Sequence, residues 1–105
     1  MHDFTEYDKV FTLLDYCYRI CEEDALGALL GMMDRELFEG DMPADAAEYN
    51  DFMRIYKGKS TRETAIDFLV WHMEEFDFPL LESVNILREM EDGEVRAILE
   101  KSLKL

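Results

Sequence analysis

Glycine, proline and long apolar runs are all scarce in this sequence. Its 105 residues include 5 Gly and 2 Pro, and no segment alternates polar and apolar residues for long enough to predict a strand. No apolar run reaches the roughly 18 residues that a transmembrane helix needs. The opening stretch MHDFTEYDKV lacks the basic region and apolar core of a signal peptide, and the 2 Cys fit a reducing cytoplasm. We therefore expect a helical, cytoplasmic protein.

Basic residues are also in short supply. The chain holds 25 Asp and Glu against 11 Lys and Arg, a formal charge of -14. This excess repels phosphates, which argues against nucleic acid as a direct partner and against anionic membrane surfaces. It permits a basic protein partner, a bound cation or simply high solubility. A hydrophobic content of 49% nevertheless predicts a folded chain.

Apolar residues recur every three or four positions, which predicts a series of helices. Thr5 and Asp24 are the expected N-caps of the first two, Gly40 and Pro43 separate the second from the third, and Ser60 begins a capping box. The predicted helices cover residues 5–22, 24–39, 43–57, 60–76, 80–91 and 95–105, with a turn or kink at EDGE before the last. The expected fold is all-α: a single compact domain, 1–105, of five or six short helices in an irregular bundle, with 1–57 and 60–105 as the alternative halves.

Two glycines stand inside the predicted second helix, EEDALGALLGMM. Gly27 and Gly31 are four residues apart and share one helix face. Each costs about 1 kcal/mol relative to Ala in a helix interior, so another interaction must offset this cost. The sequence favours a tight helix crossing within the domain, and a groove kept open for a partner is the alternative.

The negative charge is concentrated in one segment. Residues 22–51 contain ten acidic residues and a single base, Arg35, a net charge of -9. Such a patch can steer a cationic partner toward the protein. The predicted partner-binding residues are Asp24, Asp34, Glu36, Glu39, Asp41, Asp45, Glu48 and Asp51 for charge, with Tyr49 or Phe52 as the apolar anchor.

No catalytic, cofactor or metal motif stands out. Cys17 and Cys21 lie one helical turn apart and, with His2 and His72, could in principle form a zinc site, but core packing explains both cysteines more simply. The segment DMPADAAEYND lacks the acid spacing, central Gly and terminal Glu of a calcium loop. Trp71 is expected to cover the edge of the core, and a contact with a partner is its alternative role. We expect no cofactor and no catalytic residues.

The segment 22–53 resembles small acidic bacterial proteins, most of them uncharacterised and some of them similar to immunity proteins for bacterial toxins. The residues that carry this resemblance are Glu23 and Asp24, Leu29–Leu30–Gly31, Pro43–Ala44–Asp45 and Tyr49 to Phe52. Gly40 and Asp41 stand in inverted order relative to that pattern, and Tyr49 and Phe52 stand where it has tryptophans. The resemblance implies a helical, non-enzymatic protein and does not extend into residues 57–105.

Three hypotheses follow from these patterns. The leading one is an acidic, non-enzymatic protein-binding module, most simply an immunity-type inhibitor of a basic, toxin-like protein. The second is a scaffold or regulatory subunit that self-associates, for example as a homodimer, through apolar helix faces; the 7 Met and the aromatic residues motivate it. The third is an enzyme that uses an Asp/Glu cluster with a divalent metal.

Overall fold

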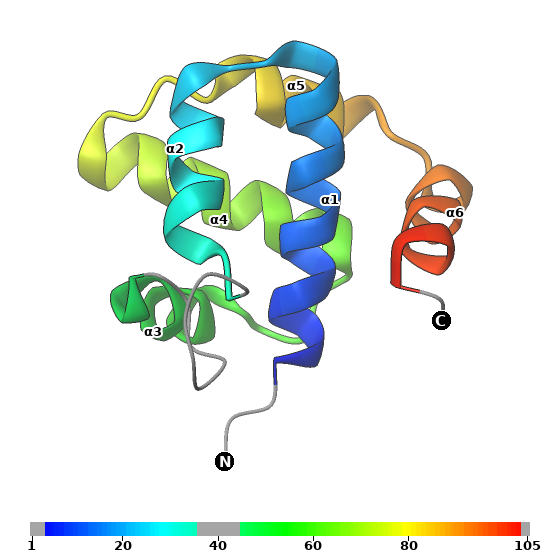
Figure 1. Ribbon diagram of the computed structural model, residues 1–105, viewed down its shortest axis with the longest axis horizontal. Coiled ribbons are helices and arrows are strands. Elements are labelled where there is room, and N and C mark those ends of the chain that lie inside the picture. Colours follow the sequence, from blue (N-terminus) through cyan, green and yellow to red (C-terminus); the bar gives the residue numbers. More distant parts are fainter. Residues whose placement is uncertain (1–3, 36–44, 104–105) are drawn as a thin grey trace.

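The chain is all-α. A computed structural model describes residues 4–35 and 45–103, and the helices within these ranges are α1 (Thr5–Cys21), α2 (Asp24–Met33), α3 (Ala46–Ile55), α4 (Thr61–Phe76), α5 (Leu81–Glu89) and α6 (Asp92–Leu103) (Figure 1). The predicted fold class is confirmed. The radius of gyration is 12.8 Å, close to the value of about 13 Å that a folded domain of 100 residues has.

None of the helices in the described ranges is both long and apolar enough to cross a membrane.

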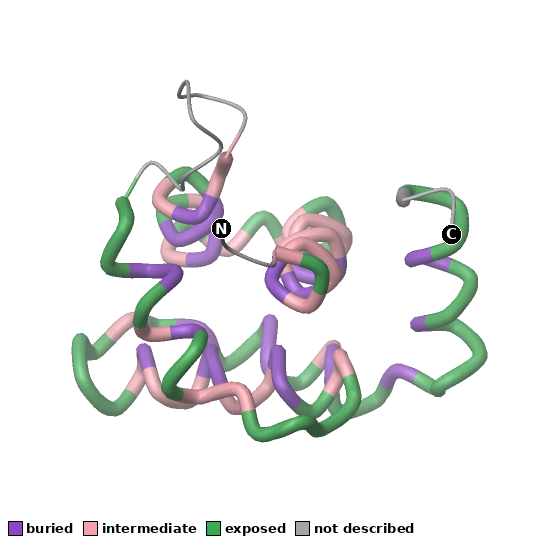
Figure 2. The backbone as a smooth tube through the Cα atoms, turned by 90° about the horizontal axis from the view of Figure 1, so that it is seen from below, coloured by how far each residue is buried: buried purple, intermediate pink, exposed green. Residues whose placement is uncertain are grey.

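Helix α1 is the hub of the bundle. It packs against α2, α4, α5 and α6, whereas α3 packs against α2 and α4. The buried side chains of α1 are Tyr7, Val10, Leu13, Leu14 and Cys17. Helix α6 lies at the edge of the molecule, and its buried positions face the rest of the bundle (Figure 2). Buried hydrophobic residues come from all six of these helices and form one cluster, so the described parts of 1–57 and of 60–105 share one core.

The start of α4 is as the sequence predicts. The Ser60 hydroxyl accepts a hydrogen bond from the Glu63 backbone N–H at 3.2 Å, and the helix then runs to Phe76. The prediction holds because the capping interaction lies within four residues of sequence and needs no tertiary partner.

The predicted N-caps of α1 and α2 are wrong by one position. Phe4 and Glu23 are the N-caps, and Thr5 and Asp24 are the first helical residues. Helix α2 also ends at Met33 instead of continuing toward Gly40, because Asp34 is extended and the Tyr7 hydroxyl donates to the Met33 carbonyl at 2.7 Å. The predicted break at Gly40 and Pro43 lies outside the described residues.

The third and last helices also differ in where they begin. Helix α3 starts at Ala46, since the Asp45 carboxylate caps it by accepting from the Ala47 N–H at 3.0 Å. Helix α6 starts at Asp92, three residues before the predicted Val95. Two acids in its first turn, Asp92 and Glu94, complement the positive end of the helix dipole. The expected turn at EDGE is therefore largely the first turn of α6.

The two glycines of α2 have different surroundings. A Cβ on Gly27 would lie 2.8 Å from Cε1 of Tyr18, so Gly27 permits the close packing of α2 on α1, as the sequence predicted. A Cβ on Gly31 would meet nothing within 4 Å. Gly31 is exposed, and none of the helices in residues 4–35 and 45–103 crosses close enough to explain it.

Candidate interaction surface

Glu23 joins two distant segments at one end of the molecule. Its carboxylate accepts hydrogen bonds from the backbone N–H of Glu82 at 3.2 Å, from the N–H of Ser83 at 3.1 Å and from the Ser83 hydroxyl at 2.6 Å. The first N–H groups of a helix have no partner within that helix, and a negative charge suits that end of the helix dipole. Glu23 thus caps α5 from 60 residues away and places the α1–α2 connection beside the start of α5 (Figure 1).

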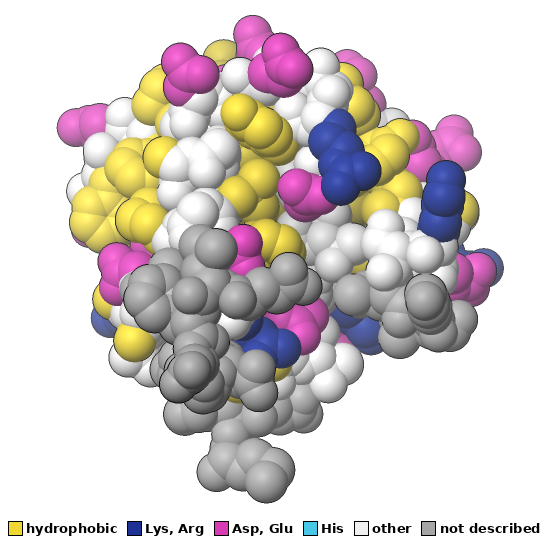
Figure 3. Space-filling model, in the orientation of Figure 1, with side chains coloured by type: hydrophobic (Ala, Val, Ile, Leu, Met, Phe, Trp, Pro, Cys, Tyr) yellow, Lys and Arg dark blue, Asp and Glu magenta, His cyan; other side chains and the backbone are white. Residues whose placement is uncertain are grey.

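The two segments that Glu23 joins, and the end of α4 that precedes the second of them, are rich in acidic side chains, and we call this region the acidic end. It comprises Glu22, Glu23, Asp24, Glu74, Glu75, Asp77 and Glu82, which come from the α1–α2 connection, the end of α4 and the start of α5. All except Glu23 are exposed. The chain has no Lys or Arg from residue 20 to 34 or from 63 to 87. Figure 3 shows acidic side chains along the upper rim of the molecule, with hydrophobic surface between them.

Large apolar side chains are exposed in the same segments. Ile20 is 56% exposed, Phe76 53% and Leu81 58%, whereas the other large exposed hydrophobic residue of the described chain, Met53, belongs to α3. Phe76 and Leu81 flank the connection between α4 and α5. The acidic end therefore combines negative charge with apolar groups that could anchor a partner.

Most of the charges at the two ends of α4 run against its helix dipole, although Glu63 in the first turn favours it. Lys57, Lys59 and Arg62 lie at its N-terminal end, which already carries a positive partial charge. Glu74 and Glu75 occupy its last turn, which contains no basic residue. Each charge placed this way costs about 0.3–1 kcal/mol at low ionic strength. Stability of α4 alone therefore does not explain this arrangement.

The backbone at the acidic end is strained as well. Glu22 has φ 49° and Asp77 has φ 56°, and these are the only non-glycine residues with positive φ in the described ranges. Their N–H groups close α1 and α4 by donating to the carbonyls of Tyr18 and His72. Glycine is the residue that adopts this left-handed conformation at little cost. Two helices thus end in acidic residues where glycine would fit better.

The structure divides the predicted 22–51 patch. Asp24 lies at the acidic end, whereas Asp34 is at the other end of α2, which at 1.5 Å per residue is about 15 Å away. Asp45 caps α3, and Asp51 forms an ion pair with Arg54. Glu36, Glu39 and Asp41 lie outside the described residues. Arg35, the one base of the segment, makes a bidentate pair with Asp8 at 3.0 and 2.7 Å.

Three of the predicted contact residues face inward, and their assignment to a binding surface is wrong. Tyr49 is 6% exposed and packs on Phe4, with ring centroids 4.8 Å apart. Phe52 is fully buried and lies 5.8 Å from the ring of Phe68. Glu48 is 5% exposed. The amphipathic stripe of α3 covers the core, so these residues hold the helix in place and are not available to a partner.

Glu48 is buried because it has a partner on another helix. Its Oε2 lies 2.9 Å from Nε2 of His72, which is itself 0% exposed. The other ring nitrogen of His72, Nδ1, lies 2.8 Å from the Phe68 carbonyl oxygen. Four aromatic rings surround the imidazole, those of Phe68, Trp71, Phe76 and Phe78, with centroids 4.6 to 5.7 Å away. The sequence suggested only a possible zinc-ligand role for His72, and it did not predict the pairing with Glu48.

The cysteines behave as packing residues. Cys17 is buried, and burial raises the pKa of its thiol to about 12, which leaves it protonated and unreactive at neutral pH. Cys21 is half-buried, with its sulfur 3.6 Å from the Ser83 hydroxyl. No group of three or more His, Cys, Asp or Glu side chains within residues 4–35 and 45–103 is arranged to hold a metal ion.

Sequence reasoning missed most of the acidic end. The sequence analysis assigns no role to Glu74, Glu75, Asp77 or Glu82, because they are far in sequence from the dense segment 22–51. The available signal was the complete absence of Lys and Arg from residue 63 to 87.

The fold and this surface define an all-α domain with one strongly acidic end. Comparisons of the chain with protein-family models, with curated proteins and with solved structures gave no significant match.

Proposed function

We propose that this protein is an acidic, non-enzymatic protein-binding module, and specifically an immunity-type inhibitor of a basic bacterial toxin. One observation carries the proposal: the segments of the acidic end carry seven carboxylates and two exposed apolar side chains, Phe76 and Leu81, and they lie within two stretches, 20–34 and 63–87, that contain no Lys or Arg. A toxin that acts on nucleic acid presents a cationic site, and an acidic protein can occupy it in place of phosphate.

The two kinds of side chain would act at different stages of binding. The carboxylates steer the cationic partner and raise the association rate. Phe76 and Leu81 then lose their water-exposed area against the partner and slow dissociation.

Charge reversal tests the proposal. The partner to try first is the product of the adjacent reading frame, if that product is basic. The triple variant Glu74→Lys, Glu75→Lys, Asp77→Lys should lower the association rate at least about tenfold, measured by stopped-flow fluorescence. A matched control, Glu89→Lys, Glu91→Lys, Glu94→Lys, makes the same charge change at exposed positions near the α5–α6 junction. Equal effects of the two triples would refute a role for the acidic end.

The exposed apolar residues favour one second candidate, self-association through Phe76 and Leu81. Salt separates the two functions. Two acidic ends repel each other, so self-association should strengthen as salt screens that repulsion, whereas binding to a basic partner should weaken. Light scattering at high protein concentration decides: a strict monomer at both about 0.05 M and about 1 M salt removes self-association.

A further inference from the structure

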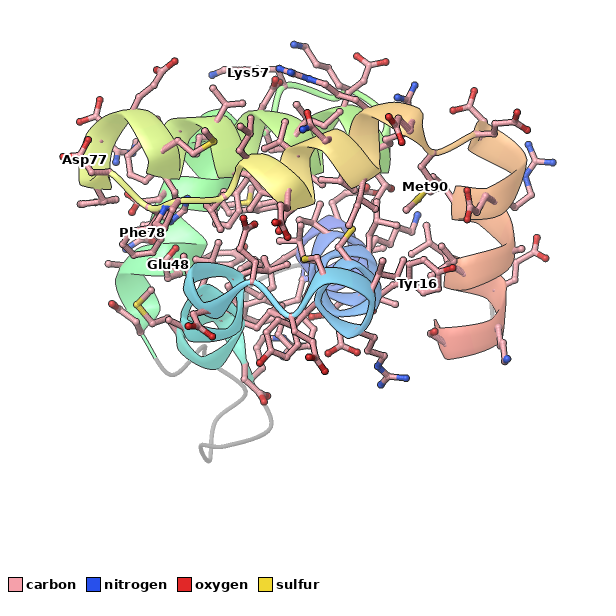
Figure 4. The ribbon with its side chains drawn as sticks, turned by 90° about the horizontal axis from the view of Figure 1, so that it is seen from above. Tyr16, Glu48, Lys57, Asp77, Phe78 and Met90 are labelled. Atoms are coloured by element: carbon pink, nitrogen blue, oxygen red, sulfur yellow. The ribbon has the colours of Figure 1, made fainter. Side chains whose placement is uncertain are left out.

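The buried Glu48–His72 pair joins α3 to α4. The two residues are 24 positions apart in sequence, and both side chains are withdrawn from water. Glu48 is the buried acidic residue of α3, and the other buried residues of that helix, Tyr49 and Phe52, make aromatic contacts. Figure 4 shows Glu48 at the same end of the molecule as Phe78 and Asp77.

Proton counting shows what the pair requires. The Phe68 carbonyl only accepts hydrogen bonds, so Nδ1 of His72 must carry a proton to bond with it. The contact of 2.9 Å between Nε2 and Oε2 then needs a second proton, which sits either on the imidazole or on the carboxyl. With both protons present the pair is neutral overall and both hydrogen bonds form.

Loss of one proton removes one of these hydrogen bonds. If Nδ1 keeps its proton, the lone pair of Nε2 faces the negative Glu48 carboxylate. If the remaining proton moves to Nε2, the lone pair of Nδ1 faces the Phe68 oxygen. Either state leaves an unpaired polar group and a net negative charge in a buried site, which is costly.

We propose that the Glu48–His72 pair is a proton-operated clamp: with its shared proton it fixes α3 on α4, and release of that proton to solvent loosens α3. Burial alone lowers the pKa of His72, but the hydrogen bonds to Glu48 and to Phe68 outweigh it, so that this pKa lies above its ordinary value of 6.5. Because the folded pKa is raised, the stabilisation is fully present below pH 6.5 and is lost as pH rises through the folded pKa.

Within the described residues, no other charged or titratable group near the pair compensates for loss of the shared proton. On α3, Asp51 also favours the protonated imidazole, and it is paired with Arg54. Helix α1 contributes Tyr7, and burial followed by the charge of Glu48 raises the pKa of this phenol so far that it stays neutral. The buried residues of α5 do not titrate. The backbone N–H of Asp77 donates to the backbone carbonyl of His72, and the Asp77 side chain is exposed to solvent.

The clamp is tested on the protein alone, so its outcome is independent of the proposed function. His2→Gln removes the only other histidine. In that background, hydrogen exchange of the α3 amides, corrected for intrinsic rates, is followed from about pH 6 to about pH 9. The single Trp, Trp71, lies 5.0 Å from the imidazole, so its fluorescence reports the protonation of His72. As the pH rises over this range, we expect the protection factors of the α3 amides to fall at least about tenfold more than those of the α1 amides. The midpoint of this fall should coincide with the midpoint of the change in Trp71 fluorescence.

Glu48→Gln should abolish this pH dependence. The Gln amide N–H donates to Nε2 while Nδ1–H keeps its bond to Phe68, so both ring nitrogens are satisfied without an extra proton. Glu63→Gln is the matched control, since it makes the same change at an exposed position of α4. Protection of α3 that does not depend on pH in the wild type, or an unchanged dependence in Glu48→Gln, would overturn the clamp. If Glu48→Gln does not fold, hydrogen exchange of the wild type decides. A change in α3 protection whose pH midpoint differs from that of the His72 ¹⁵N titration would also overturn the clamp.

Discussion

Replacing Glu22 by glycine should make the protein more stable. Glu22 ends α1 in the left-handed conformation, with φ 49°, and its side chain is exposed. A residue with a Cβ pays about 1–2 kcal/mol in this conformation, and glycine does not. The substitution also removes a negative charge beside the negative end of the α1 dipole, where an acid is unfavourable.

The magnitude follows from two opposing effects. Relief of backbone strain contributes about 1–2 kcal/mol, while the greater freedom of glycine in the unfolded chain takes back about 0.4–1 kcal/mol. A net gain of about 1 kcal/mol remains, which corresponds to a rise in Tm of about 4–8 °C for a domain of this size. Asp77→Gly, at the end of α4, should give a smaller gain, because Asp tolerates the left-handed region better than Glu.

Urea unfolding followed by circular dichroism measures this change. The midpoint should rise while the slope with urea stays constant, since the buried area is unchanged. Gly58→Ala is the reverse control: Gly58 has φ 75° and a Cβ there would meet nothing within 4 Å, so only backbone strain is added and about 1 kcal/mol is lost. A destabilised Glu22→Gly beside a destabilised Gly58→Ala would show that the Glu22 side chain stabilises the fold and would refute the reasoning.

Further predictions concern contacts between helices. Glu23→Ala removes three hydrogen bonds to the start of α5 and should cost about 2 kcal/mol in urea unfolding; a loss below about 0.5 kcal/mol would show that water replaces this cap. Gly31→Ala should stabilise by about 0.5–1 kcal/mol because the added methyl group meets nothing. Gly27→Ala should gain less or lose stability, because its methyl group displaces Tyr18, and equal gains at both glycines would contradict the tight crossing.

The sequence predicts the features of this fold that are encoded within a few turns of helix. The apolar stripes and the Ser60 cap depend on residues three or four positions apart, and the helices appear where the stripes place them. Helix ends are less predictable when a tertiary contact decides them. The hydrogen bond from Tyr7 to the carbonyl of Met33 is one such contact, and it joins residues 26 apart.

The candidate surface was only partly predictable for a similar reason. A count of charges along the chain finds the dense segment 22–51, but it cannot separate a buried carboxylate such as Glu48 from an exposed one such as Asp24. It also cannot show that Glu23 meets Ser83 across 60 residues. In the sequence, Glu48 cannot be told apart from an exposed acidic residue. Its burial is explained by its hydrogen bond to His72, which lies on another helix.

The central claim is that a cationic protein docks on the acidic end. Hydrogen exchange of the free protein and of its complex with a basic toxin-like partner tests this claim most directly. The account predicts new protection in residues 20–24 and 74–83, which contain the acidic end and the exposed side chains of Ile20, Phe76 and Leu81. Protection confined to α6 and the N-terminal half of α1, with residues 74–83 unchanged, would contradict it.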